Sequence, residues 1–125
     1  MWSKKDNLRK GKAGEETACR YLRRRGFRIL ARNYRSPFGE LDIVATRGGQ
    51  IVFCEVKTRT LGDAEEALGS VDATRRRRMA QAASHFLDRE GASCSHCRFD
   101  VIALLREGGK WKIMHVEDAF EVGDL

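Results

Sequence analysis

Two neighbouring apolar segments of the chain carry acids and a lysine at spacings that could do chemistry. Asp42 lies within residues 39–44, Gly-Glu-Leu-Asp-Ile-Val. Glu55 and Lys57 lie within residues 53–57, Phe-Cys-Glu-Val-Lys. If both segments are strands, Glu55 and Lys57 point to the same face one pleat apart, because side chains alternate along a strand. Carboxylates bind Mg²⁺ and a nearby lysine can orient a water molecule, or deprotonate it in the amine form, so this pattern suits metal-dependent hydrolysis of a phosphodiester.

The intervening Gly48-Gly49 predicts that the two segments form a hairpin with a two-residue turn. The register of that turn places Asp42 opposite Glu55, and Glu40 opposite Lys57. Facing carboxylates repel each other in a sheet, and a divalent cation would compensate the repulsion. Asp42 and Glu55 are therefore the candidate metal ligands, and Glu40 is a candidate for supporting them. An ordinary amphipathic hairpin with its acids in water is the alternative interpretation.

The other face of this hairpin is apolar and is expected to pack against a helix. Its members are Leu41 with Val56, Ile43 with Cys54, and Ala45 with Val52. The acids would thus occupy the face that the core does not need.

A helix is predicted over about residues 8–25 by its apolar periodicity, and Gly26 is typical of the position just past a helix end. Glu15 shares the apolar face of this helix, so it is expected to point toward the sheet, where a carboxylate needs a partner or a metal. Glu15 therefore joins the three strand residues as a candidate catalytic residue. A small rotation of the helix would instead leave it in water. The helix face consists of Leu8, Gly11, Gly14, Glu15, Ala18 and Leu22.

A second helix is predicted over about residues 73–90, with Asp72 as its N-cap. Four consecutive arginines begin at Arg75, in the first turns, where the helix dipole disfavours cations. A bound phosphate would reverse that cost, because guanidinium groups and a helix N-terminus both attract anions. Arg75 and Arg78 share one side of the helix and, with Arg59, are the candidates for nucleic-acid binding. A run of solvated charges is the alternative.

The remaining apolar runs predict strands at about residues 27–34, 39–47, 50–59, 98–105 and 111–116. The predicted order is helix, three strands, helix, two strands. The chain of 125 residues shows no linker or internal repeat, so residues 1–125 are predicted to form a single domain.

The charge balance favours an anionic partner. The chain has 24 Lys and Arg residues against 18 Asp and Glu residues, a formal net charge of +6. Such a surface suits nucleic acid. Few aromatic residues accompany the arginine run, so recognition of a duplex or branched backbone is favoured over stacking on single strands.

The N-terminal residues lack the apolar stretch of a signal peptide, and no run of about 18 apolar residues occurs, so the expected location is cytoplasmic with no membrane partner. The four cysteines are therefore expected to be reduced thiols, with Cys19 and Cys54 in the core. Cys94, His96 and Cys97 have the spacing of half a zinc site, but a structural site needs four ligands and no zinc is expected. A zinc-stabilised interaction protein is a third hypothesis.

These motifs together resemble those of the YraN-like family of small bacterial proteins. The matches extend over about residues 11–120. They comprise Gly11-x-x-Gly14-Glu15, Asn33-Tyr34-Arg35, Gly39-Glu40-Leu41-Asp42-Ile43-Val44, Phe53-Cys54-Glu55-Val56-Lys57-Thr58-Arg59 and Cys97-Arg98-Phe99-Asp100-Val101.

That family resembles the restriction-endonuclease-like superfamily and the archaeal Holliday-junction resolvases. The resemblance implies an α/β (α+β) fold with an αβββαβ core, in which two helices flank a mixed central sheet. It also implies a site built from a helix Glu, a strand Asp and a Glu-x-Lys, which fall here on Glu15, Asp42, Glu55 and Lys57. Asp100 fits the family pattern as well, and a structural role is expected for it.

The expected function is that of an endonuclease, dependent on Mg²⁺ or Mn²⁺, that hydrolyses phosphodiester bonds in duplex or branched DNA rather than RNA. The resemblance also implies a homodimer, because paired cuts in a junction need two sites related by symmetry. The alternative is a nucleic-acid-binding module that keeps the nuclease fold with weak or no catalysis.

Overall fold

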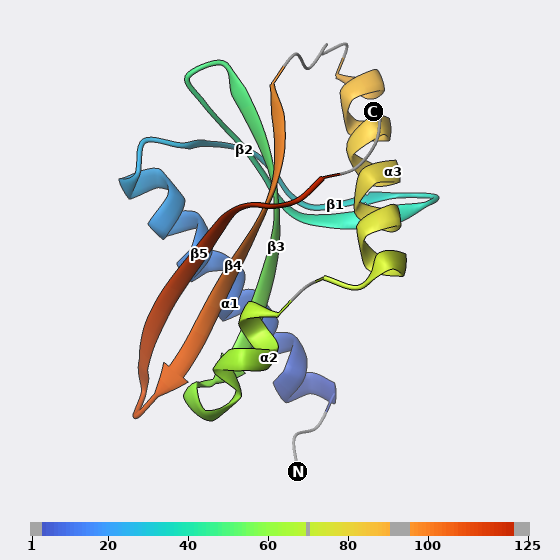
Figure 1. Ribbon diagram of the computed structural model, residues 1–125. Coiled ribbons are helices and arrows are strands. Elements are labelled where there is room, and N and C mark those ends of the chain that lie inside the picture. Colours follow the sequence, from blue (N-terminus) through green and yellow to red (C-terminus); the bar gives the residue numbers. More distant parts are fainter. Residues whose placement is uncertain (1–3, 70, 91–95, 122–125) are drawn as a thin grey trace.

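The computed structural model describes residues 4–69, 71–90 and 96–121 (Figure 1). The predicted order of helix, three strands, helix and two strands is confirmed, with a 3-10 helix and a short helix added before the second long helix. The elements are α1 (Lys4–Arg24), β1 (Arg28–Ser36), β2 (Gly39–Arg47), β3 (Gln50–Thr60), η1 (Leu61–Asp63), α2 (Ala64–Leu68), α3 (Ala73–Arg89), β4 (Cys97–Glu107) and β5 (Lys110–Phe120).

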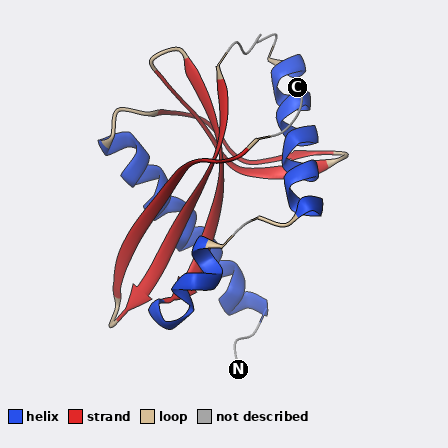
Figure 2. Cartoon of the chain, viewed as in Figure 1, coloured by secondary structure: helices blue, strands red, loops and turns tan. Residues whose placement is uncertain are grey.

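The five strands, red in Figure 2, form one sheet, and their order is β1-β2-β3-β4-β5. Only the central pair β3 and β4 is parallel, so the expected mixed sheet is confirmed. Parallel strands need a long crossover, which α2 and α3 supply. Gly48-Gly49 and Gly108-Gly109 both have positive φ, as the tight turns of the two antiparallel hairpins require.

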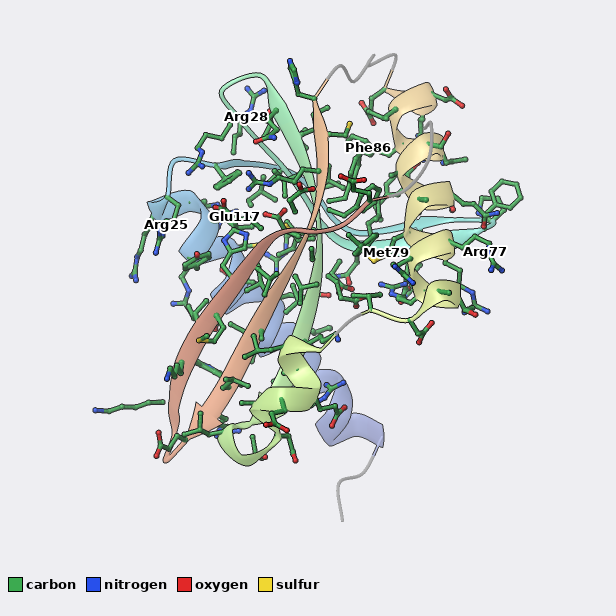
Figure 3. All side chains as sticks on the ribbon, in the orientation of Figure 1. Arg25, Arg28, Arg77, Met79, Phe86 and Glu117 are labelled. Carbon is green, nitrogen blue, oxygen red and sulfur yellow. The ribbon has the colours of Figure 1, made fainter. Side chains whose placement is uncertain are left out.

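The two faces of the sheet carry separate apolar clusters. Helix α1 covers one face, and α2 and α3 cover the other (Figure 1). Met79 and Phe86 of α3 point toward the sheet, whereas Arg77 lies on the outer side of that helix (Figure 3). The α1 cluster includes Ala18, Leu22, Ile43, Val52, Cys54, Ile102 and Leu104, and the α3 cluster includes Leu41, Val44, Phe53, Met79, Phe86, Phe99 and Val101.

Gly14 brings α1 close to the sheet. A Cβ atom at this position would lie 2.5 Å from Thr58 Oγ1 and 3.3 Å from Leu104 Cδ1. No real Cβ atom fits at the first distance, so the glycine is what allows the helix to settle on β3 and β4.

The predicted β2–β3 register is confirmed near the turn and wrong beyond it. The ladder runs from the Arg47–Gln50 pair to the Ile43–Cys54 pair and ends there. The expected pairings of Asp42 with Glu55 and of Glu40 with Lys57 therefore do not form. The strands part because Asp42 uses its carboxylate, not its backbone, to bind the next amide of β3.

The expected apolar face of the hairpin is divided between the two sides of the sheet. Val56 packs with the α1 cluster, but Leu41 packs with the α3 cluster. Asn33, opposite Asp42 on the neighbouring strand, has a φ of 50°, a left-handed conformation that interrupts the alternation of β1. The acids consequently lie on a face on which α2 and α3 also pack. The expectation that they occupy a face the core does not need is therefore wrong.

Cys19 and Cys54 are buried free thiols, as predicted. Cys97 is disulfide-bonded, so the expectation of a reduced thiol is wrong for this residue. That expectation rested on the redox state of the cytoplasm, which is a property of the compartment and not of the chain. Cys94 lies outside the described residues, so its spacing with His96 and Cys97 is not tested.

Asp100 has the structural role expected for it. It is fully buried on β4 and accepts hydrogen bonds from the Arg98 guanidinium (2.8 and 2.9 Å), His115 Nε2 (2.6 Å) and the Asp118 amide (2.9 Å). Burial alone would raise the pKa of Asp100, but the bonds from His115 and Arg98 lower it below its usual value. The ionised carboxylate thereby holds the irregular segment of β5 around Asp118, whose φ is 51°.

None of the helices that the structure describes is long and apolar enough to cross a membrane.

Candidate functional site

The candidate site lies on β3, between the part of the sheet on which α3 packs and the part on which α2 packs. Glu55, Lys57 and Arg59 alternate with residues that face α1, so all three point to the α2 and α3 side. They border a cavity of about 350 Å³ whose remaining wall comes from the segment that leads into α3. The lining residues are Glu55, Val56, Lys57, Arg59, Val71, Asp72 and Arg75.

Asp42 reaches this region from β2, at the point where the two strands part. Its Oδ2 accepts a hydrogen bond of 2.8 Å from the Val56 amide. Burial and the nearby charge of Glu55 raise the pKa of Asp42 to about 7, although the Val56 bond works in the opposite direction. The two carboxylates are therefore close enough for the charge of Glu55 to disfavour ionisation of Asp42, even though the two residues are not paired in the ladder.

Arg75 compensates Glu55 in this arrangement. Its Nε lies 2.5 Å from one Glu55 oxygen and its Nη2 lies 3.3 Å from the other, a two-pronged ion pair. The side chains of Glu55 and Arg75 are only 14% and 22% exposed, so water screens the pair weakly. Arg75 also donates to the Glu40 carbonyl at 3.3 Å. A guanidinium from α3 thus neutralises one member of the acid pair.

The start of α3 fixes the position of Arg75. Asp72 is the N-cap, as predicted, and its Oδ1 accepts the Arg75 amide at 2.8 Å. Arg75 and Arg78 both border a second cavity of about 280 Å³, which shares Arg75 with the first. The second cavity is lined by Arg35, Ser36, Gly39, Glu40, Arg75 and Arg78.

Glu15 lies outside the group formed by Asp42, Glu55 and Arg75. It is half-buried, as a residue facing the sheet would be, but its Oε2 accepts a hydrogen bond of 2.7 Å from the Asn33 side chain. Asn33 lies beside Asp42 in the sheet, between the pairs that flank it. Glu15 is therefore connected to the site through Asn33, and its expected support of a metal stays a prediction.

The other predicted residues lie at different depths in the site. Lys57 is half-buried and lines the first cavity beside Glu55. Arg59 lines it too, but its Nε is paired with Glu66 of α2 at 3.0 Å. Glu40 is exposed, and its carboxylate approaches Arg35 at 3.8 Å instead of Lys57.

Two contacts of the site were missed by sequence reasoning. Arg75 was considered only as a phosphate ligand, although the Asp72 cap three residues upstream fixes where its side chain starts. Asn33 carried a usable signal, because a strand asparagine can adopt positive φ and its amide can hold a carboxylate.

No group of three or more Asp, Glu, His or Cys side chains gathers around a common point in the part of the chain that the structure describes. Two carboxylates such as Asp42 and Glu55 still fit Mg²⁺, which usually keeps several water ligands and binds one or two carboxylates together with substrate phosphates. The donor set is thus suited to a metal that arrives with its substrate. A preformed all-protein cage would need further ligands.

The fold and the site define a small α+β protein with an αβββαβ core and a carboxylate pair beside a basic helix N-terminus. A sequence profile of the uncharacterised protein family UPF0102 matches residues 14–104, and the chain belongs to this family. The expected YraN-like membership is thereby confirmed.

Relatives in the same family are similar over most of their length. A UPF0102 protein of Nitrosococcus oceani is 40% identical over 90% of this chain and 92% of its own. One from Pelotomaculum thermopropionicum is 43% identical over 88% of this chain and 93% of its own, and one from Moorella thermoacetica is 46% identical over 77% and 80%.

Among solved structures, that of Pyrococcus furiosus SfsA in complex with Ca²⁺ is similar, with a TM-score of 0.44 and 18% sequence identity. The likeness covers 94% of this chain and 66% of the SfsA chain.

Proposed function

We propose that this protein is an endonuclease, dependent on Mg²⁺ or Mn²⁺, that hydrolyses phosphodiester bonds in duplex or branched DNA. The observation that carries the proposal is the approach of Asp42 to Glu55, which lines a cavity together with Lys57 next to the N-terminus of α3. Two acids brought together at the end of a strand ladder destabilise the sheet unless a cation compensates them. Arg75 pairs with Glu55, but the pKa of Asp42 is still raised to about 7, so the pair would gain from a bound divalent cation.

Asp42 and Glu55 would hold the metal, which polarises a phosphate and lowers the pKa of its bound water. Lys57 follows Glu55 on the same face, so its ammonium could donate a hydrogen bond that orients this water, and the unprotonated amine could accept a proton from it. Occupation of Glu55 by a metal would displace the guanidinium of Arg75. Arg75 would then be available for a phosphate together with Arg78 at the helix N-terminus.

The β1–β2 hairpin extends this basic surface. Its turn is fixed because Ser36 Oγ accepts hydrogen bonds of 3.1 Å from the amides of Phe38 and Gly39. Gly39 lies against the backbone of α3, where a Cβ atom would meet Arg78 O at 2.5 Å. The turn thus presents Phe38, 59% exposed, close to the arginines of α3. An apolar side chain in this position suits a distorted or branched duplex, in which it can stack on an unpaired base.

Cleavage assays with Mg²⁺ or Mn²⁺ test the proposal on supercoiled plasmid, forked and four-way DNA. The wild-type protein should cut at least one of these, and Asp42→Asn and Lys57→Ala should reduce the rate by about 100-fold or more. Arg89→Gln, at the exposed far end of α3, is the matched control for a general loss of positive charge. Equal rates in wild type and both site variants would reject the assignment.

A nucleic-acid-binding module without catalysis is the second candidate, and the Arg75–Glu55 ion pair favours it. A guanidinium already neutralises the acid that a metal would need. This candidate predicts DNA binding that is unchanged by EDTA and no thermal stabilisation by Mg²⁺. An endonuclease predicts a rise in melting temperature with Mg²⁺ that disappears in Asp42→Asn.

The proposed action on branched DNA also predicts a homodimer. Light scattering with and without a four-way junction measures the mass of the complex. Two chains per junction support paired cutting, whereas one chain per junction restricts the proposal to single cuts.

A further inference from the structure

A third cavity lies on the opposite side of the sheet, between the C-terminal half of α1 and β5. Its volume is about 420 Å³, and it is independent of Asp42, Glu55 and the function proposed for them. It is lined by Thr17, Arg20, Tyr21, Arg24, Arg25, Trp111 and Ile113.

Three arginines on this cavity form no ion pair with the side chains that the structure describes. Arg32, Arg59, Arg75 and Arg98 are each paired with a carboxylate elsewhere in the protein. Arg20 is near enough to Glu16 to lower its pKa, but neither it nor Arg24 or Arg25 makes an ion pair among residues 12–69, 71–90 and 96–121.

The negative end of the helix dipole explains only part of this cluster. It stabilises cations in the last turn of α1, which accounts for Arg24. Arg20 lies one turn earlier, and like charges four residues apart on a helix repel each other. An anion bound between Arg20 and Arg24 would turn this repulsion into attraction, because guanidinium groups bind phosphate through several hydrogen bonds.

Two aromatic side chains form the rest of the cavity wall. Tyr21 and Trp111 are both half-buried, and the Arg25 guanidinium lies over the Tyr21 ring at 5.0 Å from its centroid. Figure 3 shows Arg25 at the outer end of α1. Trp111 packs at the margin of the α1 cluster and has Arg106 near its ring at 5.7 Å. Flat aromatic and guanidinium groups of this kind stack on nucleobases.

A buried network fixes the Tyr21 ring. The Tyr21 hydroxyl lies 2.9 Å from His115 Nδ1, and His115 Nε2 donates to the fully buried Asp100 at 2.6 Å. Asp100 is held in turn by Arg98. The wall of the cavity is therefore anchored in the middle of the sheet, and binding would not have to order the ring first.

We propose that this cavity binds one nucleotide unit, with its phosphate between Arg20 and Arg24 and its base against Trp111. A free mononucleotide and the end of a nucleic-acid strand share this chemistry. On a strand, the site would hold the nucleic acid on the face of the sheet opposite Glu55.

Tryptophan fluorescence tests the proposal in EDTA, so that no divalent cation contributes. The chain has two tryptophans, and Trp2→Phe leaves Trp111 as the only reporter. Titration with thymidine monophosphate and with a 5′-phosphorylated single-stranded oligonucleotide should quench Trp111. Tighter binding of the oligonucleotide assigns the site to a strand, and equal binding assigns it to a free nucleotide.

The charge-reduced variant Arg20→Gln/Arg24→Gln should bind both ligands at least about tenfold more weakly. The variant Arg77→Gln/Arg89→Gln removes the same charge from exposed positions on α3 and should bind them as the parent does. Circular dichroism checks that both variants fold.

Three results would overturn the proposal. They are unchanged Trp111 fluorescence at millimolar ligand, equal weakening in the two variants, and inorganic pyrophosphate binding as tightly as the nucleotide. Cleavage activity does not enter this test, so its outcome is separate from that of the proposed endonuclease.

Discussion

Replacing Asp42 by Asn in the metal-free protein should abolish a pH dependence of stability that the acid pair creates. Burial and Glu55 raise the pKa of Asp42 from 3.8 to about 7. Asparagine has nearly the same shape and still offers an oxygen to the Val56 amide, but it cannot ionise. The substitution therefore removes the charge and leaves the contact.

The direction of the effect follows from proton binding. Because the pKa of Asp42 is higher in the folded state, the folded protein binds more protons than the unfolded chain between about pH 4 and pH 7. The free energy of unfolding then falls as the pH rises through this interval. The change from 3.8 to about 7 corresponds to at most about 4 kcal/mol.

Urea unfolding in EDTA at pH 5 and pH 8 measures this contribution. The wild type should lose more stability between the two values than Asp42→Asn, and at pH 8 the variant should be the more stable protein. Asp88→Asn, which removes an exposed carboxylate from α3, is the control and should follow the wild type.

Addition of Mg²⁺ at pH 8 should stabilise the wild type and leave Asp42→Asn unchanged, since the proposed metal site consists of the ionised pair. Equal pH slopes in wild type and Asp42→Asn would refute the assignment of a raised pKa to Asp42. A stabilisation by Mg²⁺ that persists in Asp42→Asn would place the metal elsewhere.

Three further substitutions test other parts of the structure. Gly14→Ala should destabilise the protein by about 1–3 kcal/mol in urea unfolding, because its Cβ would overlap Thr58 Oγ1, and adding Thr58→Ala should recover most of the loss. Asp100→Asn should cost about 3 kcal/mol or more, since it leaves the Arg98 guanidinium without its buried partner, and a loss below about 1 kcal/mol would contradict that role. Phe38→Ala should leave stability within about 0.5 kcal/mol but weaken binding to forked DNA in anisotropy titrations, with regular duplex binding unchanged; equal losses on both substrates would exclude base stacking.

Local features of the sequence were sufficient to predict most elements of the fold. Alternation and the Gly48-Gly49 turn predicted β2, β3 and their first pairs, because a two-residue turn sets the register next to it. Asp72 predicted the start of α3 for a similar reason, since a cap acts within a few residues. Helix α2 was not predicted because its five residues are too few to show a periodic pattern.

The candidate site was only partly predictable. The chemistry of Asp42, Glu55 and Lys57 was evident from residue type and spacing, and the structure brings the two acids together. Their pairing was predicted from a ladder that extends only to Ile43 and Cys54. Beyond that point a side-chain contact, Asp42 with the Val56 amide, replaces backbone pairing, and no local pattern encodes such a replacement.

The sequence by itself determined the elements, their order and the residue types available for chemistry, because turns, caps and alternation depend on neighbours along the chain. Tertiary structure alone decided that Arg75 neutralises Glu55, that Glu15 reaches Asn33, and that α2 and α3 cover the face that bears the acids. These contacts join segments far apart in sequence, and their geometry depends on how both helices settle on the sheet.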